Sequence, residues 1–136
     1  MMIAMSIAHR AAIVAAAAAA RDEVCGLLLG RNGIVEHVRA CANVAADPAR
    51  RFELDPRALL DAHRAARDGG PPIIGHYHSH PTGIAEPSAT DAAEALPDGT
   101  VWVIVAAGVL TAWRAVERGA LHGRFDMIPI VAPPQS

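Results

Sequence analysis

The chain contains no lysine: its 12 basic residues are all arginines, and with 14 acidic residues they leave a formal net charge of -2. Without an excess of positive charge, the protein has no field to attract nucleic acid or an anionic membrane, so neither is an expected partner. Cysteine is also scarce. Cys25 and Cys41 lack the spacing of a metal-binding pair and make a poor disulfide framework, which favours a reducing, cytoplasmic location.

Aromatic residues are few as well, at 4% of the sequence, and the hydrophobic fraction of 52% is inflated by alanine. We therefore expect a core built from valine, isoleucine, leucine and alanine. The length of 136 residues suffices for one domain with a single core, and no repeat or linker divides the chain. Residues 1–136 are expected to form one domain.

No hydrophobic run is long enough to cross a bilayer. The most apolar stretch, AAIVAAAAAA at residues 11–20, faintly resembles the core of a secretory signal, but it is short and alanine is only weakly apolar. No basic residue precedes Arg10, whereas a signal begins with positive charge. Because alanine is a strong helix former, the stretch instead predicts a first helix from about Ser6 to Arg21.

Apolar runs separated by glycine and proline predict strands mixed with helices. The tripeptide RNG at residues 31–33 predicts a hairpin turn between the first two strands. This mixture indicates an α/β fold, a single-domain sandwich with a mixed β-sheet flanked by helices. The expected strands are 24–30, 34–41, 73–80, 100–107, 109–117 and 120–131, with helices at 57–68 and 88–96 and late turns at Gly108 and Gly119.

Three of the seven histidines occupy alternate positions in the predicted strand IIGHYHSH, residues 73–80. Because strand side chains alternate between the two faces, His76, His78 and His80 point the same way. Two imidazoles two residues apart can converge on one metal ion, and Asp91 in the first turn of the next helix would supply a third ligand. Two histidines, a carboxylate and an open fourth position are typical of a catalytic zinc site, where the metal lowers the pKa of water toward neutrality.

Ser88 and Asp91 also fit a simpler interpretation. A serine followed three residues later by an acidic residue is a capping box, which starts a helix and requires no metal. The alternating histidines would then be partly buried polar side chains with ordinary hydrogen bonds. The spacing alone leaves the metal site and the capping box open, and for Ser88 the two roles need not exclude each other.

The pattern resembles the signature of the JAMM metalloproteases, also called MPN+, of the short prokaryotic type. That signature is a glutamate, then H-[ST]-H, seven residues, a serine, two residues and an aspartate. Here it reads HSH at residues 78–80, PTGIAEP, Ser88, AT and Asp91, without a gap. Upstream, DEVCGLLLG at residues 22–30 is similar to the segment that carries the family's glutamate. The resemblance extends from about residue 20 to 117.

This resemblance implies a JAB/MPN fold, similar to that of cytidine deaminases, and a role for each motif residue. His78, His80 and Asp91 would bind one zinc ion per chain, with water as the fourth ligand. Glu23 would take a proton from that water and pass it to the leaving amine. Ser88 would hold the carbonyl oxygen as it becomes an oxyanion. The chemistry is coherent, because one carboxylate can act first as base and then as acid.

Other residues near the pattern are expected to have structural roles. His76 shares a face with the ligands but matches no motif position, so it would support or pack against them. Cys25 lies two residues from the glutamate, but no Cys-His motif accompanies it, and a small core residue is expected. Glu86 is expected to be a solvated loop charge. Core positions are expected for Trp102 and Trp113, and exposed positions for His9, His37, His63 and His122.

Departures from the family narrow the expected substrate. Eukaryotic members carry two insertions that grip ubiquitin, whereas here the segment 42–56 is modest and the region 106–120 is a tight turn. Such a bare catalytic core resembles bacterial members that act on ubiquitin-like sulphur carriers ending in Gly-Gly. The implied function is that of a zinc-dependent peptidase or isopeptidase, which hydrolyses the amide bond after that tail.

Three rival functions are open at this point. A catalytically inactive MPN scaffold would have lost metal ligands, and the full set occurs here. A RadC-like protein of DNA metabolism shares the metal motif, but that group is longer and has an N-terminal DNA-binding region. A zinc nucleoside deaminase would need H-x-E followed by P-C-x-x-C, and neither occurs in the sequence.

Overall fold

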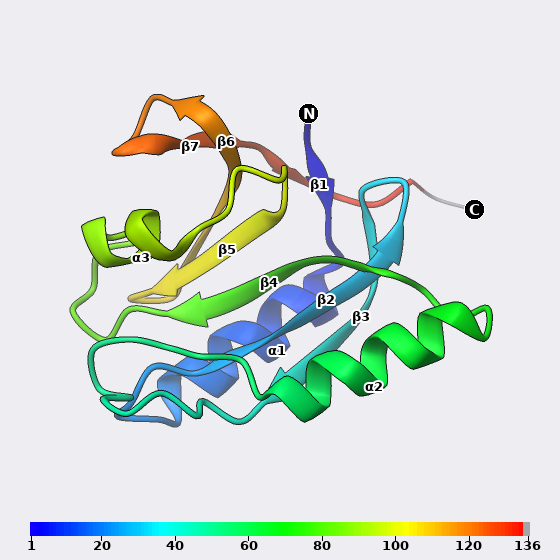
Figure 1. Ribbon diagram of the computed structural model, residues 1–136, viewed down its shortest axis with the longest axis horizontal. Coiled ribbons are helices and arrows are strands. Elements are labelled where there is room, and N and C mark those ends of the chain that lie inside the picture. Colours follow the sequence, from blue (N-terminus) through cyan, green and yellow to red (C-terminus); the bar gives the residue numbers. More distant parts are fainter. Residues whose placement is uncertain (135–136) are drawn as a thin grey trace.

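The structure, a computed structural model, describes residues 1–134. Its strands form one sheet in the order β7-β6-β5-β4-β2-β3-β1-β8, with helices packed on its faces (Figure 1). The predicted α/β class with a mixed sheet is confirmed. The strands are β1 (Ile3–Ala4), β2 (Cys25–Arg31), β3 (Ile34–Cys41), β4 (Ile73–Ser79), β5 (Val101–Ala106), β6 (Val109–Gly119), β7 (Gly123–Ile128) and β8 (Ile130–Val131), and the helices are α1 (Ile7–Ala18), α2 (Pro56–Arg67) and α3 (Ala89–Glu94).

The β2–β3 hairpin forms at the predicted turn. Asn32 and Gly33 both have positive φ angles, 56° and 73°, as a type I′ turn requires at its two central residues. The twist of such a turn matches that of the two antiparallel strands, and it sets a register with Arg31 opposite Ile34. β2 is thereby fixed as a central strand between β3 and β4.

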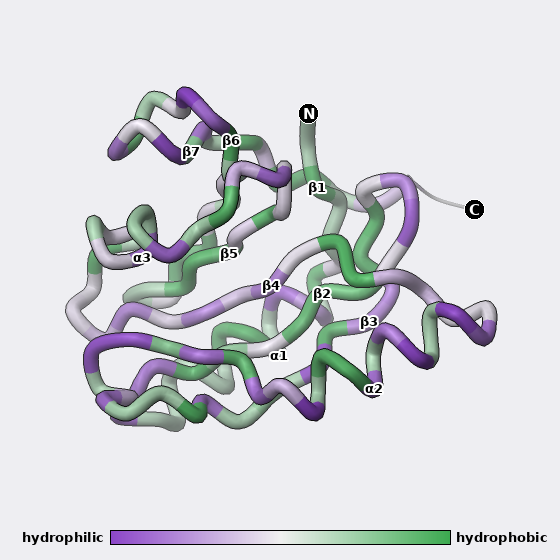
Figure 2. Tube along the Cα trace, in the orientation of Figure 1, coloured by the Kyte–Doolittle hydropathy of each residue, from purple (hydrophilic) through white to green (hydrophobic). Residues whose placement is uncertain are grey.

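Alternating side chains of the central strands build an apolar core on each face of the sheet. α1 covers one face, where Ile13, Leu28 and Val103 are buried. α2 covers the opposite face, where Leu27 and Ala62 are buried. Figure 2 shows hydrophobic residues along β2 and β5, whereas hydrophobic and hydrophilic residues alternate along α2. The sheet is therefore the apolar middle layer between the helices.

Strand β4 carries polar side chains through this apolar layer. It pairs antiparallel with β2 and parallel with β5. Tyr77 points into the core beneath α1, so by alternation His76 and His78 point to the other face. That face holds the aromatic cluster beside α3, which includes Trp102 and Phe125. The end of β4 therefore brings buried polar groups to the border of this cluster.

The structure differs from the predictions at both ends of the chain. β1, which the sequence did not predict, pairs in parallel with β3 and β8. The predicted strand 120–131 is confirmed only in part: β7 and β8 lie within it, but residues 120–122 precede β7 and Pro129 separates β7 from β8. Gly119 ends β6 instead of turning the chain, and His122 in the turn has a φ of 53°. Proline has no N–H for a ladder, so Pro129 ends the pairing of β7 and lets the chain cross to β1.

The alanine-rich stretch forms helix α1, as predicted, although the helix is shorter than expected. It begins after the N-cap Ser6, whose hydroxyl accepts a hydrogen bond of 3.1 Å from the backbone N–H of His9. Among residues 1–134, no helix combines the length and the apolar character needed to cross a membrane.

Gly26 lies where the core leaves no room for a side chain. A Cβ atom at this position would overlap the ring of the buried Tyr77 on the neighbouring strand. We expect Gly26→Ala to lower the free energy of unfolding by about 1–3 kcal/mol, the usual cost of overpacking a core. Urea denaturation measures the effect. In a Tyr77→Leu background the same substitution should cost less, and an equal loss in both backgrounds would contradict the overlap.

Candidate metal centre

His78 and His80, at the end of β4, turn their ring nitrogens toward each other. Their Nε2 atoms lie 2.9 Å apart, and both residues are buried. The Nδ1 atom of His80 lies 2.9 Å from the carbonyl oxygen of Ile84. Because a carbonyl only accepts hydrogen bonds, Nδ1 carries the proton and Nε2 keeps its lone pair. The loop after β4 thus orients the ring of His80 with the lone pair of Nε2 toward His78.

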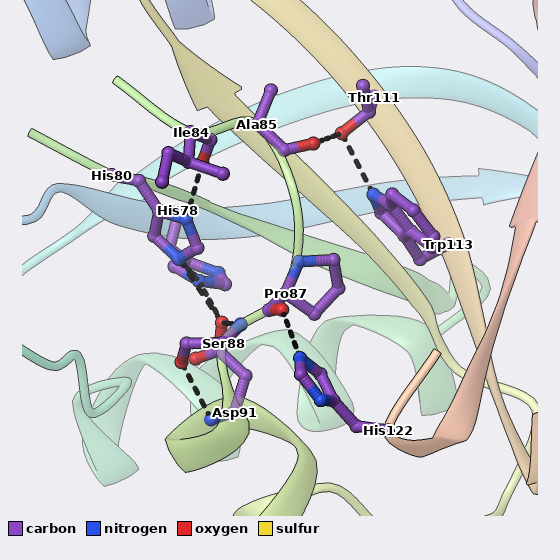
Figure 3. A network of polar contacts seen from close by, with 10 residues as sticks. All are labelled: His78, His80, Ile84, Ala85, Pro87, Ser88, Asp91, Thr111, Trp113 and His122. Carbon is purple, nitrogen blue, oxygen red and sulfur yellow. Dashed lines mark hydrogen bonds and ion pairs between the residues drawn. The ribbon is translucent and has the colours of Figure 1, made fainter. Parts of the chain in front are cut away.

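Asp91 reaches the same point from the first turn of α3. Its Oδ2 atom lies 3.2 Å from Nε2 of His78 and 3.2 Å from Nε2 of His80, as Figure 3 shows. Burial alone would raise the pKa of the Asp91 carboxyl, but its hydrogen bonds to the two histidines hold that pKa well below its usual range. The carboxylate is therefore ionised where the two ring nitrogens converge.

The capping box is present at the same place. The backbone N–H of Ser88 donates to Asp91 Oδ2 at 2.9 Å, and the N–H of Asp91 donates to Ser88 Oγ at 3.0 Å. The capping box therefore forms without turning Asp91 away from the two histidines. The cap fixes the carboxylate so that the oxygen that accepts from Ser88 also faces the histidines. Ser88 Oγ accepts in the cap, so its own proton is free for another acceptor.

Glu23 lies in the segment between α1 and β2, shortly before β2 begins at Cys25. A carboxylate oxygen of Glu23 and ring nitrogens of His78 and His80 lie within 4.8 Å of one another. Glu23 is buried, and its Oε1 atom has no hydrogen-bond partner. Burial raises the pKa of Glu23 from its ordinary 4.5 to about 7, against the attraction of His80.

The donor atoms fit a zinc ion. Ligands about 2.0–2.1 Å from a tetrahedral zinc lie about 3.3 Å from one another. The three separations among His78 Nε2, His80 Nε2 and Asp91 Oδ2 are 2.9, 3.2 and 3.2 Å. Imidazole nitrogen and carboxylate oxygen are ordinary zinc ligands. The unpartnered oxygen of Glu23 beside them suits a group that binds or releases a proton. Glu23, His78 and His80 also lie close enough together to hold a metal ion between them.

An aromatic contact that the sequence did not reveal supports His78. The ring of Phe52 stacks on His78 with 4.1 Å between centroids and 19° between planes. Phe52 also contacts His76, and the ring of His76 packs edge-on against Trp102 with 4.5 Å between centroids. Since Nδ1 of His78 has no hydrogen-bond partner, this stacking holds the ring. Phe52 lies in the irregular segment 42–56, whose sequence carries no periodicity that could have placed it there.

A cleft of about 190 Å³ opens beside these groups. One side is formed by Ala49 and Arg50, and the other by Pro81 and Thr82, which begin the loop after β4. The same cleft is lined by Glu23, His80 and Ser88. A substrate in this cleft would therefore contact the candidate base, a candidate ligand and the free hydroxyl together.

The structural roles expected for other residues can be compared with their burial. Trp102, Trp113 and Cys25 are buried, and Glu86 is exposed, as predicted. His9 is half-buried and not exposed as predicted, because it precedes the buried Ile13 by one turn on the inner side of α1. Exposed positions are confirmed for His37, His63 and His122.

Three curated proteins are similar in sequence to this chain. A desampylase of Haloferax volcanii is 39% identical over 84 residues, 60% of each chain. A probable TtuB-protein conjugate cleaving protease of Thermus thermophilus is 42% identical over 76 residues, 56% of this chain and 51% of the relative. A desampylase of Pyrococcus furiosus is 31% identical over 111 residues, 81% of this chain and 79% of the relative. The match thus spans less than two thirds of the first two relatives.

Solved structures show the same fold. A protein from Desulfitobacterium hafniense superimposes with a TM-score of 0.82 and 28% identity, covering 98% of this chain and 94% of that one. A JAB1/MPN domain protein from Archaeoglobus fulgidus superimposes with a TM-score of 0.59 and 18% identity, over 96% and 98% of the two chains. The family of prokaryotic homologues of the JAB domain matches residues 6–116, which include all the converging side chains. This chain belongs to that family.

Proposed function

We propose that the protein is a zinc-dependent peptidase or isopeptidase, which hydrolyses the amide bond after the Gly-Gly tail of a ubiquitin-like or sulphur-carrier protein. The observation that carries this proposal is the convergence of His78, His80 and Asp91 with the buried carboxylate of Glu23. Names of the relatives agree with it, since they describe a desampylase and a protease that cleaves protein conjugates.

In this proposal His78, His80 and Asp91 hold one zinc ion per chain. Zinc in that position would supply Lewis-acid catalysis to water and to the scissile carbonyl. Glu23 accepts the proton of the attacking water at a carboxylate oxygen and later delivers a proton to the leaving amine. The Ser88 hydroxyl, whose proton is not used in the capping box, donates to the developing oxyanion.

The small size of the cleft favours a substrate without side chains at the scissile bond. Its volume of about 190 Å³ leaves little room beside the wall residues Ala49 and Pro81. A Gly-Gly tail can pass between such walls as an extended chain, and its backbone can still approach the candidate metal ligands. The two free thiols, Cys25 and Cys41, suit a reducing compartment, and we place the activity in the cytoplasm.

A matched pair of fusion substrates tests this proposal. The substrates are a carrier protein joined through Gly-Gly to a peptide, and the same fusion with alanine or valine in place of the last glycine. We expect cleavage immediately after Gly-Gly, at least about tenfold slower cleavage of the substituted substrate because its side chain meets the cleft wall, and loss of both activities with a chelator. Equal, chelator-insensitive cleavage of the two fusions would contradict the proposal.

A further inference from the structure

The backbone at Glu23 is held from two sides by hydrogen bonds that belong to no helix or strand ladder. From one side, the N–H of Glu23 donates to the carbonyl of Pro48 at 2.8 Å, and Asn43 Nδ2 donates to the carbonyl of Glu23 at 2.8 Å. From the other side, the N–H of Val24 donates to Ser79 Oγ at 2.8 Å, and the N–H of Ser79 donates to the carbonyl of Val24 at 3.0 Å. These four contacts hold the backbone at Glu23 and Val24 from both sides.

On the side of the irregular segment, the side chain of Asn43 makes most of the hydrogen bonds. Besides Glu23, its Nδ2 donates to the carbonyl of Arg51 at 3.0 Å. Its Oδ1 accepts from the N–H of Ala45 at 3.1 Å and from the N–H of Glu53 at 3.1 Å. One side-chain amide thus closes the irregular segment 43–53 on itself and joins it to Glu23. Only asparagine combines two donors and an acceptor on so short a side chain.

We propose that Asn43 is a positioning residue for the proposed hydrolysis: through its amide it holds Glu23 at the distance from His78 and His80 that proton transfer requires. The inference rests on the proposed function, in which Glu23 is the general base. It extends that function because the irregular segment 43–53 would then position the general base, besides forming one wall of the cleft. Asn43 itself contacts neither the candidate metal ligands nor the reacting atoms.

The substitution Asn43→Asp tests the contact. Aspartate has the same shape and keeps an oxygen for the N–H groups of Ala45 and Glu53, but it loses the donor that faces the carbonyls of Glu23 and Arg51. We expect kcat on a Gly-Gly fusion to fall by about tenfold to hundredfold, because small displacements of a catalytic group are costly. KM should change by less than about twofold, since the lost interaction serves the transition state. Zinc content should not change.

A double-mutant cycle separates positioning from a general structural role. In a Glu23→Gln background, Asn43→Asp should lower the residual kcat no further, because the group that it positions is already disabled. Additive losses in the double variant would mean that Asn43 acts through the segment or through substrate binding, and they would overturn the proposal. Arg51→Ala serves as a control, since it removes the ion pair of the segment with Glu94 on α3 and should leave kcat within about twofold.

Amide hydrogen exchange of the protein without zinc or substrate gives a readout that does not depend on activity. Asn43→Asp should speed exchange of the Glu23 N–H by about fivefold or more, because the adjoining hydrogen bond is lost, whereas Arg51→Ala should not. If the wild-type protein cleaves no carrier fusion, the proposed function fails and the exchange rates still test the contact. Unchanged exchange in Asn43→Asp would overturn the positioning role, whatever the activity.

Discussion

Glu23→Gln is expected to lower hydrolysis by about a hundredfold or more while zinc remains bound. Glutamine has nearly the same size and shape as glutamate, so the buried site keeps its packing. Its neutral amide cannot accept a proton, so the step assigned to the unpartnered carboxylate oxygen is lost. The measurement is kcat on a Gly-Gly fusion, with metal analysis of the same preparations.

Glu86→Gln is the matched control for this variant. Glu86 is exposed in the loop after β4, so its loss of charge should leave kcat within about twofold. Full activity of Glu23→Gln together with a loss in Glu86→Gln would move the base to Glu86. Loss of zinc from Glu23→Gln would instead identify Glu23 as a ligand, in the Glu23–His78–His80 arrangement.

The second large effect concerns the metal itself. The wild-type protein should bind about one zinc per chain, and His78→Ala or Asp91→Ala should lower zinc affinity by at least about a hundredfold, because each removes one of three protein ligands. Chelation should lower the melting temperature of the wild type but not of these variants, since only the wild type is stabilised by the ion. Metal analysis and thermal unfolding of each protein measure the two effects.

Asp91→Asn distinguishes the metal site from the capping box. The asparagine oxygen can still accept from the N–H of Ser88 and keep the cap, but the negative charge that faces the two histidines is lost. We expect it to lose zinc with little change in the helix. His63→Ala, on the exposed side of α2, is the control and should keep the metal. Unchanged zinc content in His78→Ala and Asp91→Ala would leave the cap as the only role of Ser88 and Asp91.

Local signals in the sequence predicted most of the regular elements. The hairpin at 31–33, strand β3 and the start of α3 at Ser88 follow from turn and cap chemistry, which depends on a few adjacent residues. The sequence did not predict the two-residue strand β1, because two residues carry no periodic pattern. This strand is defined only by its pairing with β3 and β8, which are distant in sequence. The long strand predicted at 120–131 failed where Pro129 interrupts the ladder.

For the site, the sequence by itself determined the residue types, their spacing and their likeness to a family. Alternation along β4 put His78 and His80 on one face, and the interval from Ser88 to Asp91 fixed a helix start, because both are local rules of backbone geometry. That one domain spans residues 1–136 stays a prediction.

Only the tertiary structure decided how distant segments meet. Nothing local to residues 19–24 places Glu23 within 4.8 Å of the histidines. The backbone there is hydrogen-bonded to Asn43 and Ser79, which are 20 and 55 or more residues away in sequence. The same is true of Phe52 on His78. Such contacts are set by the packing of the whole sheet and by the need to pair buried polar groups, and no short window of sequence contains both partners.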